Sequence, residues 1–177
     1  MTKASEPQSL QPATRTVRVI GIGNPDRCDD GIGWLVAQRL AGRLPPDVSV
    51  LTRGGDVMDL GDDMLGIDAL ICIDASAPMG SPGRIRRIDP ATGQLDRNTS
   101  FTSSHALGLG EVIALAEALG TASRDIVVYA VEGASFDAGA PITPEVMAVA
   151  DEVARQVSLE VNRLRRKVNV QEGTSDA

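Results

Sequence analysis

The sequence predicts an α/β fold, in which helices cover both faces of a largely parallel, twisted, five-stranded sheet. Two observations lead to this prediction. Short runs rich in Val and Ile recur along the chain, and segments whose apolar residues follow helical spacing separate most of these runs. Strands that alternate with helices form parallel sheets, and the helices then pack on both faces in a three-layer arrangement.

The first strand and the first helix are the clearest of the expected elements. Residues 17–22 (VRVIGI) are β-branched and end in a glycine turn, which is typical of a strand. From there the spacing of apolar residues changes to a helical period, so we expect an amphipathic helix over 30–44. Pro45 and Pro46 would stop this helix.

The middle of the chain supplies three more strands. A short strand is expected at 48–51 and a short helix at 57–65. The continuous apolar run 69–73 (ALICI) is typical of a central strand that is covered on both faces. The basic segment 84–88 is expected to be a short strand at an edge of the sheet.

In the C-terminal part of the chain we expect a helix, a strand and a second helix. A helix over 110–119 would be capped by Gly120, and the apolar run 126–131 (IVVYAV) would be the last strand. Thr143 and Pro144 suit the cap and the first turn of a final helix. That helix carries a long apolar stripe, formed by Met147, Ala150, Val153, Ala154, Val157, Val161 and Leu164.

One α/β domain over residues 16–166 is expected between two polar ends. The chain has 177 residues, of which 42% are hydrophobic and 23% charged, as in a single globular domain. Residues 1–15 are rich in Ser, Thr, Pro and Gln, so we expect a disordered lead-in there. Residues 167–177 are expected to form a polar tail.

Charge and hydrophobicity exclude several classes of function. The formal net charge of −7 disfavours nucleic acids and anionic membranes as partners. No apolar run approaches the roughly 20 residues that cross a bilayer, and the first 16 residues lack the apolar core of a signal peptide. We therefore expect a cytoplasmic protein that has no nucleic-acid or membrane partner. We also expect it to be monomeric.

The two cysteines are expected to be small buried thiols rather than metal ligands or redox groups. Cys28 and Cys72 do not form a CxxC pair. Cysteine catalysis is also disfavoured, because the acidic neighbours of Cys28 would raise the pKa of its thiol and oppose formation of the thiolate.

Residues that could carry chemistry fall where strands end. Asp29 and Asp30 follow the first expected strand, Asp74 follows the ALICI run, and Glu132 follows the last strand. His105, the only histidine, precedes the third long helix. The carboxyl ends of parallel strands share one edge, where ligands bind in such folds. We therefore expect these five side chains to project toward the same edge.

Two of these carboxylates and the imidazole would make a partial shell for a divalent transition ion such as Ni²⁺ or Zn²⁺. Each residue also has a structural interpretation. Asp29 suits the cap of the first helix, Asp74 suits a turn, and His105 could be a satisfied polar residue. Because no second His or thiolate pair completes a structural site, the sequence predicts a weak, exchangeable one.

The glycine turn at 21–25 (GIGNP) also invites a dinucleotide interpretation. Asp26 occupies the position of the third glycine of GxGxxG, and the acidic residues that follow would repel a pyrophosphate. A GxSxG serine-nucleophile motif is missing from the sequence. Neither nucleotide binding nor serine catalysis is therefore predicted.

Five short motifs follow one another in a recognisable order: GIGN at 21–24, DDGIG at 29–33, IDA at 73–75, SH at 104–105 and VEG at 131–133. In this order they resemble the motifs of the hydrogenase maturation endopeptidases. The similarity extends over residues 17–164. The chain departs from the family pattern at three places. Residues 54–56 are Gly-Gly-Asp where many members have Gly-Gly-Thr, some members have Glu in place of Asp30, and Pro is common in place of Gly133.

The resemblance implies a protease that removes the C-terminal extension of a [NiFe]-hydrogenase large-subunit precursor after nickel insertion. It implies a phosphorylase/hydrolase-like fold with a five-stranded sheet between helices. It also implies that Asp30, Asp74 and His105 are the catalytic and metal-contacting residues. The nickel would arrive on the substrate and be bound transiently, and Asp29 would be a helix cap or lie behind the metal contacts.

The chemistry and two rival functions stay open at this point. The ion could polarise a carbonyl or a water, or a carboxylate could act as the base. A nickel-dependent chaperone that binds the precursor without cutting it would show the same motifs. A peptidyl-tRNA hydrolase-like enzyme shares the GIGNP turn, but the acidic charge and the Asp-Asp-Gly sequence disfavour it.

Overall fold

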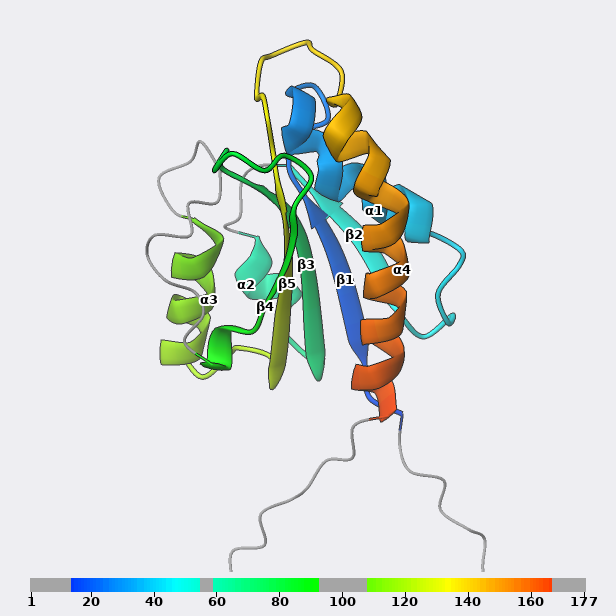
Figure 1. The fold of residues 1–177 in the computed structure, drawn as a ribbon. Helices are drawn as coiled ribbons and strands as arrows, with labels where there is room; N and C mark the ends of the chain where they lie inside the picture. The colour runs from blue at the N-terminus through cyan, green and yellow to red at the C-terminus, as the bar shows by residue number, and fades with distance from the viewer. Residues whose placement is uncertain (1–13, 55–58, 93–107, 167–177) are drawn as a thin grey trace, which may run out of the picture.

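The computed structural model describes residues 14–54, 59–92 and 108–166, which form one sheet with helices packed against it (Figure 1). The strands are β1 (Val17–Ile22), β2 (Ser49–Arg53), β3 (Ala69–Ser76), β4 (Ile85–Ile88) and β5 (Asp125–Glu132). The α-helices are α1 (Ile32–Leu40), α2 (Leu60–Asp63), α3 (Leu109–Ala118) and α4 (Pro144–Arg166). Two 3-10 turns complete the elements, η1 (Cys28–Gly31) and η2 (Pro90–Thr92).

The sheet has five strands in the order β2-β1-β3-β5-β4. β1, β2, β3 and β5 run parallel to their neighbours, and β4 pairs antiparallel with β5 at one edge. Helices α1 and α4 cover one face, while α2 and α3 cover the other (Figure 1). The predicted class, a mostly parallel sheet between two helical layers with the basic strand at an edge, is confirmed.

The central strand, β3, sets which face each candidate residue occupies. All of its residues are buried, as the apolar run predicted. Ile71 and Ile73 pack on the side of α1 and α4, whereas Leu70 and Cys72 pack on the side of α2 and α3. Because side chains alternate along a strand, Asp74 points to the same side as Cys72.

β3 extends further than the sequence predicted, to Ser76, because β5 pairs with it as far as Glu132. Asp74 therefore lies within the strand, where we had expected a residue that follows it. Its side-chain direction is fixed by the sheet and not by a turn.

The first helix is shorter than predicted. The segment Cys28–Gly31 forms the 3-10 turn η1, and α1 ends at Leu40. Ala41 is extended (ψ 126°) and Gly42 has a φ of 73°, so the chain leaves the helix before it reaches the two prolines. The predicted stop signal was therefore not the one that the chain uses.

The other helices follow their predictions with small differences. α3 ends at Ala118, and Gly120, the expected cap residue, has a φ of 69°, while the Thr121 N–H returns to the Ala116 carbonyl. In α4, Met147 is wrongly assigned to the buried stripe, since it is 40% exposed and Val146 takes the core position. No helix in the described ranges is long and apolar enough to cross a membrane.

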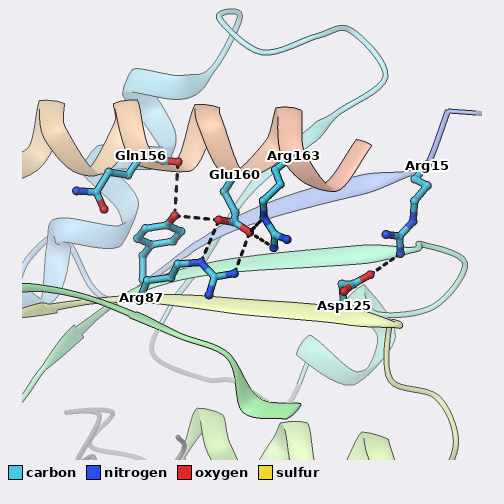
Figure 2. A network of polar contacts seen from close by, with 7 residues as sticks. Arg15, Arg87, Asp125, Gln156, Glu160 and Arg163 are labelled. Carbon is cyan, nitrogen blue, oxygen red and sulfur yellow. Dashed lines mark hydrogen bonds and ion pairs between the residues drawn. The ribbon is translucent and has the colours of Figure 1, made fainter. Parts of the chain in front are cut away.

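Ion pairs to buried or partly buried carboxylates tie α4 and the start of the chain to the sheet (Figure 2). Glu160 accepts two hydrogen bonds of 3.0 Å from the Arg87 guanidinium on β4, and Arg163 binds the same carboxylate. Arg15, assigned to the lead-in from the sequence, is 4% exposed and lies 2.7 Å from Asp125. Residues 1–13 of the expected lead-in and the whole expected tail (167–177) lie outside the described residues.

The N-terminus of α1 packs directly on the sheet through two glycines. A Cβ on Gly33 would lie 2.2 Å from the Ile22 carbonyl oxygen and 2.3 Å from the Ile73 carbonyl oxygen. A Cβ on Gly21 would lie 2.1 Å from the Gly33 carbonyl oxygen. All three contacts involve backbone atoms, so no side-chain rotation can relieve them. The glycines of the GIGN and DDGIG motifs thus allow α1 to begin over the ends of β1 and β3.

Gly33→Ala is expected to lower the free energy of unfolding by about 3 kcal/mol, because the backbone of α1 must move away from the sheet. The matched control is Gly61→Ala in α2, where nothing lies within 4 Å of an added Cβ. That change should raise the free energy of unfolding by up to about 1 kcal/mol through helix propensity. Urea denaturation of both variants measures this, and equal stabilities would contradict the close packing.

Candidate functional site

The candidate site lies at the carboxyl ends of the neighbouring parallel strands β1 and β3. This is the topological switch point of the sheet, where the connections from the two strands lead toward opposite edges. β1 leads through α1 to β2 on one side, whereas β3 precedes β4 and β5 on the other. A ligand-binding crevice is expected at such a point. Asp30 lies in η1, just after β1, and Asp74 lies near the end of β3. This edge is at the top of Figure 1, next to the first turn of α4.

The glycine turn after β1 holds Asp30. The Asn24 N–H donates a 2.9 Å hydrogen bond to Asp30 Oδ2. Gly23 has a φ of 122°, and a Cβ there would lie 1.8 Å from the Asp30 carbonyl oxygen, so only glycine fits. The GIGN and DDGIG motifs are therefore two parts of one structure that fixes this carboxylate.

Asp74 is a buried carboxyl group close to Asp30. Its side chain is 2% exposed, and its Oδ1 accepts a 2.8 Å hydrogen bond from the Ala75 N–H. Burial and then the charge of Asp30 raise the pKa of Asp74 to about 8, although the Ala75 N–H acts to lower it. Asp74 is therefore mostly protonated at neutral pH. Asp74 Oδ2 is buried and has no hydrogen-bond partner among the described residues.

His105 lies in the range 93–107, outside the described residues, so its predicted role stays a prediction. The next helix along the chain, α3, begins at Leu109 and packs on the face toward which Asp74 points. Within the described ranges, no three His, Cys, Asp or Glu side chains gather closely enough to hold a metal ion.

The predicted cap role of Asp29 is wrong. Neither η1 nor α1 has a side-chain cap hydrogen bond. The buried Asp29 carboxylate instead accepts hydrogen bonds from the Ala134 N–H (2.7 Å), the Ser135 N–H (3.1 Å), and the Thr143 N–H (2.7 Å) and hydroxyl (2.9 Å). Burial acts to raise the pKa of Asp29, but these hydrogen bonds lower it below its usual range. Asp29 thus joins both ends of the loop 133–143 to the turn that carries Asp30.

Cys28 adds to the same contact between η1 and the loop. Its N–H donates to the Ala140 carbonyl (3.1 Å) and its thiol to the Pro141 carbonyl (3.0 Å). Cys72 lies fully buried in β3, where burial, followed by the charge of Asp74, raises the pKa of its thiol. Both cysteines are therefore buried thiols, as predicted, and the loop 133–143 is a part of the site that the sequence analysis did not connect to Asp29.

Glu132, at the end of β5, binds the backbone of the loop that follows β3. Its Oε1 accepts hydrogen bonds of 2.6 Å from the N–H groups of Met79 and Ser81. The Ser81 N–H, the Met79 N–H and two neighbouring arginines hold the pKa of Glu132 below its usual range against the effect of burial. The edge position expected for Glu132 is where the structure places it.

Ser76 was missed by the sequence analysis. It is 1% exposed and lies on the same face of β3 as Asp74, two residues further along. The period of two along a strand would have pointed to it, had β3 been predicted to extend beyond Ile73.

Of the segment 54–56, Gly55 and Asp56 lie outside the described residues. Arg53, the residue before this segment, forms a bidentate ion pair with Asp63 in α2. Arg53 donates from Nε (2.8 Å) and Nη2 (2.7 Å) to the carboxylate of Asp63. This pair fixes the end of β2 against α2.

Because the pKa of Asp74 is raised, we expect this residue to affect how the free energy of unfolding depends on pH. The measurement is made with a chelator, so that no metal ion occupies the site. Between about pH 4 and pH 8 the unfolded chain loses the Asp74 proton while the folded protein keeps it, so Asp74 lowers the stability as the pH rises. Asp74→Asn removes this effect. The stability of the variant relative to wild type should increase across this window by about 1.4 kcal/mol per pH unit at most, for a total of several kcal/mol.

Urea denaturation at a series of pH values measures the difference. The control is Asp47→Asn, since hydrogen bonds from Arg165 lower the pKa of that exposed carboxylate, and its removal should bring no gain as the pH rises. A constant difference between Asp74→Asn and wild type from pH 4 to pH 8 would show that Asp74 titrates normally.

The sequence and the fold have counterparts among known proteins. A model of the hydrogenase maturation protease family matches residues 35–160. The hydrogenase 2 maturation protease of Escherichia coli is 30% identical over 80% of this chain and 87% of its own length. The hydrogenase expression/formation protein HupD of Bradyrhizobium diazoefficiens is 28% identical over 81% and 74%.

Solved structures agree with the sequence comparisons. The hydrogenase maturating endopeptidase HybD from Escherichia coli superposes with a TM-score of 0.71 at 26% identity, covering 83% of this chain and 92% of that one. A [NiFe] hydrogenase maturation protease, HycI, from Thermococcus kodakarensis gives a TM-score of 0.65 at 25% identity, covering 84% and 94%.

Proposed function

This chain belongs to the hydrogenase maturation protease family, and from that premise we propose that it removes the C-terminal extension of a [NiFe]-hydrogenase large-subunit precursor after nickel insertion. The observation that supports this most directly is the pair of buried carboxyl groups, Asp30 and Asp74, at the point where the chain reverses across the sheet. A peptide hydrolase needs groups that accept and donate protons at one place.

The nickel is proposed to arrive on the substrate and to contact Asp30, Asp74 and His105. In the free protein Asp74 holds a proton because burial and the neighbouring charge oppose its ionisation. A divalent cation supplied by the precursor would stabilise both carboxylates and replace that proton. The affinity of the protease for its precursor would then depend on whether nickel is in place.

The chain's own residues would position the scissile peptide and manage its protons. Asp30 is fixed by the GIGN turn, and Asp74 by β3. Asp29 keeps the loop 133–143 against this edge, where that loop can contact the precursor. The substrate nickel can polarise the scissile carbonyl or a water, while a carboxylate acts as the base.

Asp74→Asn and His105→Ala are expected to slow processing about 100-fold or more, because each removes a contact to the nickel or a proton acceptor. Asp47→Asn is the matched control, an exposed carboxylate that pairs with Arg165 at the far end of α4. Wild type and the control should release the C-terminal peptide from nickel-loaded precursor and leave nickel-free precursor intact. Mass spectrometry of the precursor and the released peptide measures this.

The same assay separates the rival functions. If the wild-type protein binds the nickel-loaded precursor and no shortened product appears, the chain is a chaperone and the proposed activity is wrong. Normal peptide release by either site variant would instead contradict the assignment of Asp74 or His105. Equal cleavage of nickel-free precursor would contradict the role of the metal.

A further inference from the structure

Three buried polar atoms lie without a hydrogen-bond partner at the carboxyl ends of β3 and β5. They are Asp74 Oδ2, Ser76 Oγ and Glu132 Oε2, and none has a partner within the described part of the chain. Glu132 and Ser76 are each 1% exposed. Buried polar groups are nearly always hydrogen-bonded, so three unpaired atoms on neighbouring residues indicate a bound molecule.

The strand register places the three side chains on one face of the sheet. Ser76 is the register partner of Glu132 across β3 and β5, and neighbouring strands are roughly 5 Å apart. Asp74 precedes Ser76 by two residues, roughly 7 Å along the same strand and on the same face. None of the three side chains hydrogen-bonds to another. The spacing therefore suits a small molecule that bridges them.

The hydrogen-bonding properties of the three atoms indicate which molecule is bound. Two carboxyl groups disfavour an anion, and the Ser76 hydroxyl can donate a hydrogen bond as well as accept one. Water matches this set, since it donates two hydrogen bonds and accepts up to two, and buried waters typically bind two to four otherwise unsatisfied groups. The fixed Oε1 of Glu132, bound by Met79 and Ser81, leaves Oε2 free for this purpose.

We propose, on the premise of the proposed function, that Ser76 and Glu132 hold the hydrolytic water beside Asp74. Ser76 Oγ donates a hydrogen bond to the water, and Glu132 Oε2 accepts one from it. Asp74 Oδ2 forms the third hydrogen bond to the water. Glu132 is then a catalytic residue of the site, in addition to Asp30 and Asp74.

The step balances without a further reactant. The water oxygen bonds to the scissile carbonyl carbon while one water proton passes to Glu132 Oε2. When the tetrahedral intermediate collapses, the carbon–nitrogen bond breaks, and Glu132 returns that proton to the leaving amine nitrogen. The second water proton stays with the new carboxyl group. One peptide bond and one water are consumed, and Glu132 is regenerated.

Glu132→Gln tests the proposal most sharply. The glutamine Oε1 can still accept the hydrogen bonds from Met79 and Ser81, but its amide cannot take a proton from water. We expect kcat on nickel-loaded precursor to fall about 100-fold or more, with KM unchanged within about twofold. Ser76→Ala, which removes one hydrogen bond to the water, should lower kcat about tenfold.

The matched controls make the same chemical changes at buried positions whose atoms have protein partners. Ser123 Oγ hydrogen-bonds to the Met64 carbonyl, and Glu160 is bound by Arg87. Ser123→Ala and Glu160→Gln should lower Tm and leave kcat at the wild-type value. A high-resolution crystal structure of the wild-type protein should show an ordered water that bridges Ser76 and Glu132, and the Ser76→Ala structure should lose it.

The outcomes separate this proposal from the proposed function. If wild type cleaves the precursor and Glu132→Gln matches its kcat, the water assignment is wrong while the protease activity stands. An increase in KM with an unchanged kcat would indicate a substrate-binding subsite and also overturn it. If wild type does not cleave, the protease activity fails, and the hydrolytic role fails with it. A wild-type crystal structure without the bridging water overturns the assignment whatever the activity.

Discussion

Two buried carboxyl groups held close together, Asp30 and Asp74, are the interaction on which the candidate site depends. Burial and mutual repulsion keep a proton on Asp74 at neutral pH, so the free site carries less negative charge than its composition suggests. A substrate-borne cation would reverse this balance. Under the proposed function, this arrangement would bind the precursor tightly only when its metal is present.

The rest of the structure serves to bring these two groups together. Gly21 and Gly33 let α1 begin against the strand ends, and this close approach places η1 beside the end of β3. Asp29 then fixes the loop 133–143 to η1 through four hydrogen bonds. Adjacent aspartates in one motif thus have different tasks. Asp29 is an ionised structural anchor, whereas Asp30 is held by the Asn24 N–H and its charge raises the pKa of Asp74.

Much of the fold could be predicted from local patterns, whereas the partners of individual side chains could not. Strand composition and helical spacing were enough to predict a parallel sheet between helices, because both patterns indicate which residues of each segment are buried. The anchor role of Asp29 depends on a loop more than 100 residues away, and the buried state of Glu160 depends on Arg87 from an edge strand. Helix periodicity alone favoured Met147 for the core, although the helix turns Val146 inward.

The proton on Asp74 can be observed directly by following its side-chain carboxyl carbon with NMR as the pH is raised, in protein free of metal. We expect the resonance to titrate near pH 8, and in Asp30→Asn we expect a lower pKa that still exceeds the ordinary value, since burial remains when the neighbouring charge is removed. Titration of Asp74 near pH 4 in the wild-type protein would contradict the existence of a coupled, buried carboxyl pair at this site.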